Sequence, residues 1–207
     1  MIWSNYFSVL GVFLLGLLSP GPDFAVVIAQ SLSGGRLCGI RTALGIAFGL
    51  CFHISFCVLG LSFVLEQSPE YFIWLKKIGG FYLIYMAYTL WKNHRDKDQI
   101  ESIEDQRTFS IHSSFFRGFW TNILNPKATI FFVLIFSTMI PSLVEQKYLW
   151  IYGFTMVVLA SIWFCTVAWF LNLSVLQKSL EKALPMIQLG TAFFLFFFGC
   201  SAVLFSS

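Results

Sequence analysis

Two charged residues, Asp23 and Lys127, each follow a proline within an otherwise apolar stretch of the sequence. The two segments read Ser19-Pro20-Gly21-Pro22-Asp23 and Asn125-Pro126-Lys127. Proline lacks a backbone donor and clashes with the carbonyl one turn earlier, so each segment predicts a break in an apolar helix. A broken helix offers amide groups to a carboxylate and carbonyl groups to an ammonium group. The pattern therefore predicts a binding site for a small zwitterion at residues 20–23 and 125–127.

The roles of the two charges stay open at this point. An isolated break would favour a simple packing kink, but a second break followed by a charge of opposite sign favours a site. Asp23 could bind an ammonium group, carry a coupling proton, or cap the helix that follows it. Lys127 could hold a carboxylate or neutralise Asp23, because charges within a membrane usually find partners.

Three further polar residues lie in apolar surroundings. His53 could relay protons, and the alternative is a hydrogen-bonded packing histidine. Asn122 and Asn125 are expected to line a cavity or to bridge helices. We include all three in the predicted site with residues 20–23 and 126–127.

The composition predicts an integral membrane protein. Of the 207 residues, 57% are hydrophobic and only 11% are charged, whereas soluble domains contain about 25% charged residues. The apolar runs are continuous rather than alternating, which favours helices over a barrel. We expect six membrane spans, at 2–22, 42–65, 78–91, 128–144, 148–177 and 183–207. The third can cross a bilayer only if it begins near Tyr71, and the fourth extends back to 118 if Lys127 is tolerated within the membrane.

The sequence lacks the main signatures of several other classes of protein. The first apolar run lacks the basic start and the small-residue cleavage site of a signal peptide, so we expect a retained span. Five cysteines are an odd number and form no Cys-x-x-Cys, so we expect no disulfide framework. No basic and aromatic patch indicates nucleic acid. No clustered metal ligands or catalytic group is visible, and we expect neither an enzyme nor a cofactor.

The distribution of basic residues predicts the orientation. Nine of the 13 Lys and Arg residues fall in the loops after the first, third and fifth spans. The positive-inside rule places those loops in the cytoplasm and both termini outside it. The polar stretch 92–115 then forms a cytoplasmic linker between two three-span halves, 1–91 and 116–207, which make up one membrane domain. Since each half crosses the membrane an odd number of times, we expect inverted repeats whose first helices carry the two breaks.

Glycines predict close contacts between helices. Gly45, Gly49 and His53 share one helix face, and small residues at this spacing let a neighbouring backbone approach. We expect the same role in the third and sixth spans for Gly79, Gly80, Gly190 and Gly199.

At these residues the chain resembles the lysine exporter and homoserine/threonine resistance (LysE/RhtB) family of amino acid exporters. The resemblance covers nearly the whole length and is carried by Ser19-Pro20-Gly21-Pro22-Asp23, Gly45-x-x-x-Gly49-x-x-x-His53, Gly80-Phe81-Tyr82-Leu83, Gly118-x-x-Thr121-Asn122-x-x-Asn125-Pro126-Lys127, Gly190 and Gly199. It implies export of small amino acids across a bacterial inner membrane, driven by protons, with threonine or homoserine as the nearest substrates. Ala87 departs from the glycine usual in the family.

Two alternatives remain at the level of sequence. A heavy-metal cation exporter of similar architecture would need paired acidic, Cys or His ligands within the spans, and Asp23 is the sole acid there. A membrane scaffold or enzyme subunit that transports nothing would leave the matched breaks unexplained. The sequence leaves the amino acid, the coupling ion and a homo-oligomeric state open.

Overall fold

The computed structural model describes residues 2–18, 21–67, 69–93, 111–139, 145–170 and 174–204. Every element in these ranges is a helix, as predicted for an all-α protein. The elements are α1 (Ile2–Leu18), α2 (Pro22–Gln67), α3 (Pro69–Asn93), α5 (Ile111–Ile123), α6 (Pro126–Leu134), the π-helical turn η1 (Ile135–Met139), α7 (Gln146–Phe170) and α8 (Ser174–Leu204). Pro20 and residues 94–110 of the predicted linker lie outside the described residues.

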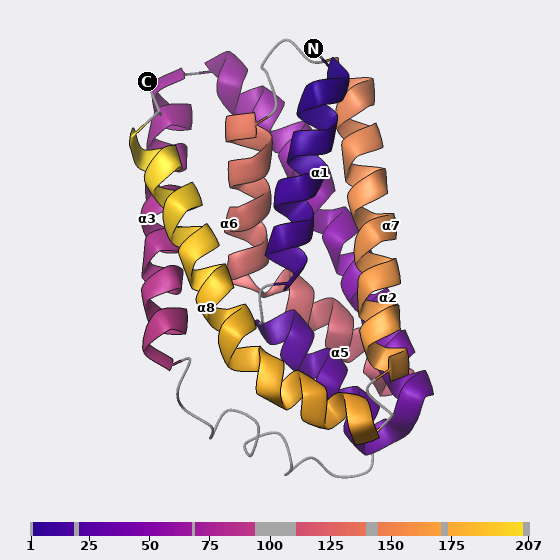
Figure 1. Ribbon diagram of the computed structural model, residues 1–207. Helices are drawn as coiled ribbons and strands as arrows, with labels where there is room; N and C mark the ends of the chain where they lie inside the picture. Colours follow the sequence, from indigo (N-terminus) through magenta and orange to yellow (C-terminus); the bar gives the residue numbers. More distant parts are fainter. Residues whose placement is uncertain are drawn as a thin grey trace.

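The first half of the chain places one helix start in the middle of the molecule. Helix α1 runs from one end of the bundle to its middle, and α2 begins there and continues to the other end (Figure 1). At Gly35 the chain turns, with φ 77° and ψ −179°, and α2 then returns along the bundle. Only glycine adopts such a positive φ without strain. The chain therefore turns immediately before Arg36, within the connection expected at Arg36 and Arg41, and both residues are helical.

The second half of the chain also places a helix start in the middle of the molecule. Helix α5 runs from the far end to the middle, and α6 continues beyond it after a bend of 54°. Helices α7 and α8 then traverse the bundle down and up again (Figure 1). As a result, the start of α1 and the end of α8 lie at one end of the molecule, and the end of α3 and the start of α5 lie at the other.

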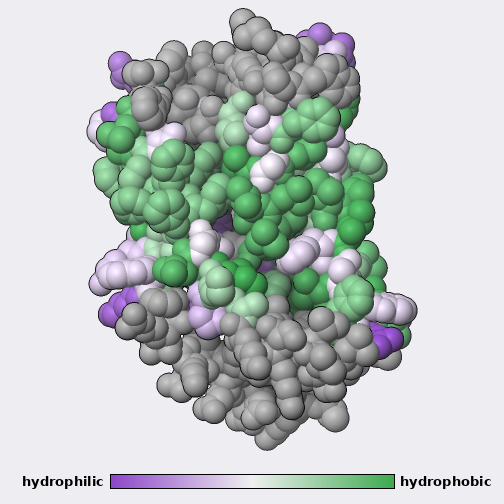
Figure 2. All heavy atoms as spheres, viewed as in Figure 1, coloured by the Kyte–Doolittle hydropathy of each residue, from purple (hydrophilic) through white to green (hydrophobic). Residues whose placement is uncertain are grey.

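The outer surface is that of a membrane protein. Pro22–Gly60, Gln146–Phe170 and Pro185–Leu204 are long and apolar enough to cross a bilayer, and the bent pair Ser113–Ile123 and Pro126–Ser137 makes a fourth span if counted as one. Figure 2 shows an apolar band around the middle of this face, with more hydrophilic residues toward the ends. An apolar surface of this extent is unfavourable against water and favourable against lipid chains. The number six stays a prediction, since Tyr6–Leu18 is apolar but short.

Helices from the two predicted halves pack on each other through glycines. Among the described elements the most extensive contacts join α2 to α5 and α3 to α8. A Cβ on Gly45 would run into the carbonyl oxygen of Phe115, and one on Gly118 would run into that of Thr42. In the same way, a Cβ on Gly80 would lie 2.8 Å from the carbonyl oxygen of Gly199. The two halves therefore interlock, with backbones in direct contact at two places.

Candidate functional site

Helix α6 begins in the middle of the molecule with a complete cap. Asn125 is the N-cap residue, in an extended conformation, and its Oδ1 accepts a hydrogen bond from the amide of Lys127 at 3.0 Å. Pro126 occupies the first turn, where its missing N–H is not needed and its fixed φ suits a helix. The sequence Asn-Pro-Lys thus starts a helix and places a charge at its second residue.

Helix α2 begins next to it in a similar way. The Gly21 carbonyl accepts the amide of Ala25 at 2.9 Å, as the Asn125 carbonyl accepts the amide of Thr129 at 3.2 Å. Pro22 is the first helical residue and Asp23 the second. From this region α2 and α6 run toward opposite ends of the bundle (Figure 1), so the positive ends of two helix dipoles meet in the middle.

The charges of the two helix starts lie close together. Lys127 is only 8% exposed, and a Cβ on Gly21 would lie 3.2 Å from its Nζ. The ammonium group of Lys127 and the carboxylate of Asp23 attract each other. On the other side, Asn122 Nδ2 donates a hydrogen bond of 2.8 Å to Asp23 Oδ2. The structure therefore brings Gly21 and Asp23 together with Asn122 and Lys127, although Asp23 and Asn122 are 99 positions apart in the sequence.

Two oxygens at this place remain without a hydrogen bond. Asp23 Oδ1 and Asn122 Oδ1 are both buried and accept no hydrogen bond from the described part of the chain. An unsatisfied buried acceptor costs about 1–3 kcal/mol, and more when it is charged. Of the two residues only Asp23 lines the cavity described below, whereas Asn122 Oδ1 lies against Gly49 of α2, so Asp23 is the one that can receive a donor group such as an ammonium.

His53 contacts the backbone of Asn122, whose side chain contacts Asp23. Its Nε2 lies 3.0 Å from the Asn122 carbonyl oxygen, and since a carbonyl only accepts, Nε2 carries a hydrogen. Its Nδ1 lies 3.5 Å from Thr129 Oγ1, and that hydroxyl is also 3.3 Å from the Asn125 carbonyl. The ring stacks on Phe132 at 6.1 Å. His53 is thus both packed and linked, through Asn122, to the carboxylate of Asp23.

A cavity of about 50 Å³ opens beside the two helix starts. This volume holds a few water-sized groups at about 10–15 Å³ each. Its polar lining residues among those described are Asp23, Asn125 and Lys127. The remaining lining residues are glycine or apolar: Phe13, Gly16, Leu17, Gly21, Phe24, Leu50, Ala128, Phe131, Phe132 and Phe164. Figure 2 shows a hollow near the middle of the apolar band with hydrophilic atoms at its floor.

Most of the predicted packing glycines lie at helix contacts, and one does not. Gly49 faces Asn122, whose Oδ1 would lie 2.7 Å from an added Cβ, and Gly79 faces Leu134 at 3.1 Å. Gly45, Gly80 and Gly199 lie at the interlocking contacts described above. Gly190 is exposed, and nothing lies within 4 Å of the position that its Cβ would occupy. The described chain offers no neighbour for the packing role predicted at Gly190.

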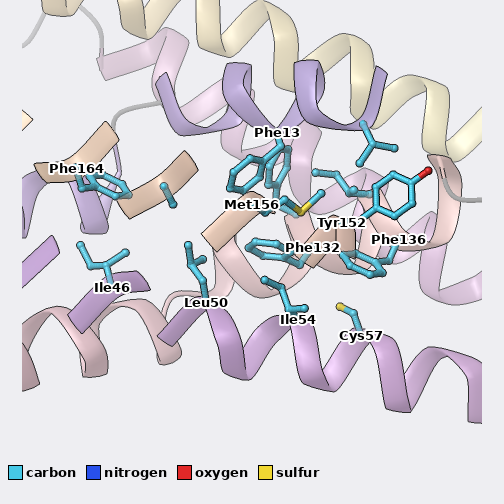
Figure 3. Close-up of a cluster of buried hydrophobic side chains, with 14 of the residues drawn as sticks. Phe13, Ile46, Leu50, Ile54, Cys57, Phe132, Phe136, Tyr152, Met156 and Phe164 are labelled. Atoms are coloured by element: carbon cyan, nitrogen blue, oxygen red, sulfur yellow. The ribbon is translucent and has the colours of Figure 1, made fainter. Parts of the chain in front are cut away.

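The sequence analysis did not identify Thr129 or the apolar side chains that line the cavity, which we call the apolar wall. Thr129 lies one turn after Asn125, and this spacing could have indicated that its side chain returns to the break. Phe13, Phe131 and Phe164 line the cavity, but nothing distinguishes them in a chain of 25 phenylalanines. Figure 3 shows Phe13 and Phe132 beside each other, with Phe164 farther along the same cluster near Ile46.

Comparison with known proteins shows which family the chain matches. The family model described as LysE type translocator matches residues 14–206. The threonine efflux protein of Escherichia coli K12 is 28% identical over 184 residues, which cover 88% of this chain and 89% of that protein. Its counterpart in Salmonella typhi is 30% identical over 190 residues, with the same coverage. The Escherichia coli protein named "Uncharacterized membrane protein YahN" is 30% identical over 131 residues, which cover 63% of this chain and 58% of that protein. No solved structure matches.

The apolar exterior and the buried charges at two helix starts define a multi-pass membrane protein with a polar centre, a type of site found in membrane transporters. Within that class, the chain belongs to the LysE type translocator family, which matches nearly its entire length.

Proposed function

We propose that this protein exports small neutral amino acids across a bacterial inner membrane. The observation that carries the proposal is the pair of opposite charges, Asp23 and Lys127, at two helix starts that border one buried cavity. An amino acid zwitterion presents the two complementary charges. Threonine and homoserine are the first substrates to test, because relatives of similar length are named threonine efflux proteins.

The geometry supports a definite orientation of the substrate. The ammonium group binds the carboxylate of Asp23, whose Oδ1 accepts no hydrogen bond from the described part of the chain. The carboxylate binds Lys127 Nζ, near the first turn of α2, whose dipole favours an anion. In this orientation the side chain of the substrate extends toward the apolar wall.

Alternating access is the mechanism that we propose for transport. The central helix starts on α2 and α6 point to opposite ends of the bundle, as expected if 1–91 and 116–207 are inverted repeats with three spans each. Rocking of one repeat against the other would open the site to each side in turn. Access from the cytoplasm would then alternate with access from outside.

Proton coupling is proposed to run through Asp23 or His53. His53 contacts the backbone of Asn122, and the side chain of Asn122 contacts Asp23. A proton on either residue would change the hydrogen bonds that reach the substrate ammonium, which is what coupling requires.

The orientation can be tested separately. With both termini outside the cytoplasm, a reporter enzyme fused after Ser207 should be active only if it works outside the cytoplasm. Activity of a cytoplasmic reporter at this position would contradict the proposed orientation.

Counterflow in proteoliposomes tests the function itself. Vesicles loaded with one unlabelled amino acid should accumulate the same amino acid in labelled form, for a limited set of small neutral amino acids. Asp23→Asn should abolish this accumulation, and Lys147→Gln, a change at an exposed lysine that does not line the cavity, should leave it intact. Failure to exchange any of the 20 common amino acids would contradict the proposal.

A further inference from the structure

Helix α2 consists of two limbs, 22–34 and 36–67, which the turn at Gly35 separates. The second limb interlocks with α5 through the backbone, because a Cβ on Gly45 would run into the carbonyl oxygen of Phe115. The first limb is joined to α5 by hydrogen bonds between side chains. Backbones in such close contact separate only if whole helices shift, whereas a side-chain hydrogen bond can exchange its partner for water. The first limb is therefore the part of α2 that can leave α5.

Two hydrogen bonds join the first limb to α5, one after the other along the helices. Asn122 Nδ2 donates to Asp23 Oδ2 at the central site, and Ser114 Oγ donates to Gln30 Oε1, each at 2.8 Å. Gln30 follows Asp23 by about two helical turns, or about 10 Å, and Ser114 precedes Asn122 by about two turns. The second bond therefore lies between the central site and the end of the molecule where α5 begins (Figure 1).

The pair of Gln30 and Ser114 is buried in the protein. Gln30 is 1% exposed and Ser114 is 0% exposed. The Ser114 carbonyl oxygen also accepts the hydroxyl of Thr42, in the second limb, at 3.1 Å, so Ser114 belongs to the interlocked side. Polar side chains at such positions in membrane proteins are costly and mark the paths of substrates. An amide and a hydroxyl can also rebind to water or to a passing zwitterion, which an apolar pair cannot do.

Glycines at both ends allow the first limb to move as one segment. Gly21 precedes its first residue, and Gly35, with φ 77°, follows its last turn. From these contacts we propose that the hydrogen bond between Gln30 and Ser114 is a gate of the central site, which opens when the first limb moves away from α5. The inference rests on the proposed function, and in the proposed orientation the gate controls the passage from the cytoplasm. Because the first limb also carries Asp23, substrate binding and the gate act on one segment.

Removal of the donor tests the gate by a change of one oxygen atom. In Ser114→Ala the closed gate loses its hydrogen bond and Gln30 Oε1 loses its donor, so the closed state is weakened. Counterflow normalised to protein amount should become faster by about 2- to 10-fold, because opening then requires less energy. Ser137→Ala makes the same change at a buried serine that bonds to the Leu134 carbonyl, and should leave the rate within about twofold of wild type. An unchanged or slower rate in Ser114→Ala, or the same increase in both variants, would overturn the gate.

A chemical bridge across the gate provides a second test, which does not depend on the rate-limiting step. The five native cysteines are replaced by alanine, and one variant then carries Gln30→Cys with Ser114→Cys, while the other carries Phe48→Cys with Phe119→Cys. The second pair joins the second limb to α5, with ring centroids 5.7 Å apart. A reagent that links two thiols should lower exchange at least about 10-fold in the first variant and by less than about twofold in the second. Reduction of the bridge should restore exchange.

The outcomes separate the gate from the exporter proposal. Full exchange with the gate bridged, or no bridge between positions 30 and 114, would overturn the gate and leave the exporter proposal standing. An equal loss of exchange in both bridged variants would show that α2 leaves α5 as a whole, which also overturns the gate. If neither the wild-type protein nor any variant exchanges an amino acid, both proposals fail.

Discussion

The two helix starts at the centre of the protein share a backbone plan and differ in how they are completed. Each has a proline first and a charged residue second, and each first carbonyl accepts the amide four residues later. At α6 the side chain of Asn125 caps the helix. At α2 the corresponding residue is Gly21, which has no side chain to do so, and the end of Lys127 lies against it.

This difference suggests a division of roles. The α6 start satisfies its own amide, so it can hold a fixed geometry whether or not a ligand is present. The α2 start instead has no capping side chain at Gly21, against which Lys127 lies, and it has an oxygen on Asp23 that accepts no hydrogen bond from the described part of the chain. We infer that the ligand completes the α2 start, while the α6 start supplies the charge that opposes it.

The largest effect on folding is expected from a substitution that forces α2 and α5 apart, because their contact brings the two helix starts together. Gly45→Ala should prevent stable folding, because its Cβ would run into the backbone of α5 at Phe115, which cannot move aside without shifting a helix. Gly190→Ala, where an added Cβ meets nothing within 4 Å, is the control. The amount of monodisperse protein after solubilisation should fall sharply for the first variant only. Normal amounts of Gly45→Ala would show that α2 and α5 can separate freely.

Removing the charge of the α2 start should stop transport and spare the fold. Asp23→Asn keeps the shape but removes one partner of a buried charged arrangement, a loss of about 2 kcal/mol or more of binding free energy and therefore about 30-fold or more in transport. Membrane insertion should not suffer, because a neutral side chain crosses the bilayer at lower cost. Counterflow rates normalised to protein amount provide the measurement. Transport at the wild-type rate would remove Asp23 from the site.

The next prediction concerns the coupling between the two starts. Asp23→Asn and Lys127→Gln should each lower thermal stability, and the double variant should lose less than the sum, by about 0.5–3 kcal/mol. Transport should not return in the double variant, because neither charge remains to hold a zwitterion. Unfolding of the purified single and double variants in detergent gives the cycle. Strict additivity would mean that the two starts act independently.

The smallest effect is expected at the cap itself. Asn125→Ala should lower the free energy of unfolding by about 1 kcal/mol, the usual value of an N-cap, and Asn125→Asp should retain most of it. Gly21→Ala should have little effect on stability, since Gly21 has no positive φ and only the flexible end of Lys127 lies within 3.4 Å of the new Cβ. Thermal unfolding of the three variants would compare the starts directly. A larger loss at Gly21 than at Asn125 would reverse the roles assigned above.

Sequence alone predicted the all-helical fold, and it singled out Asp23, Asn122, Asn125 and Lys127, which the structure places close together; their role as a site stays a prediction. It predicted a connection at Arg36 and Arg41 but did not identify Gly35, where a single glycine with positive φ makes the turn. It also could not identify the wall of the cavity, because a phenylalanine facing a substrate and one facing lipid look the same in an apolar run. The open oxygens of Asp23 and Asn122 depend on a contact between α2 and α5 that no local pattern encodes.

The glycine contacts between α2 and α5 have a consequence during synthesis of the protein. The face of α2 that carries Gly45 and Gly49 packs on α5, and the ribosome translates α5 only after α3 and residues 94–110. During that interval the nascent first half carries an exposed helix face, and the chain that will cover it does not yet exist. A polypeptide stalled before Ile111 would keep this face open and would be a natural substrate for membrane proteases. Cellular quality control could therefore distinguish a complete chain from an incomplete one by whether this face of α2 is covered by α5.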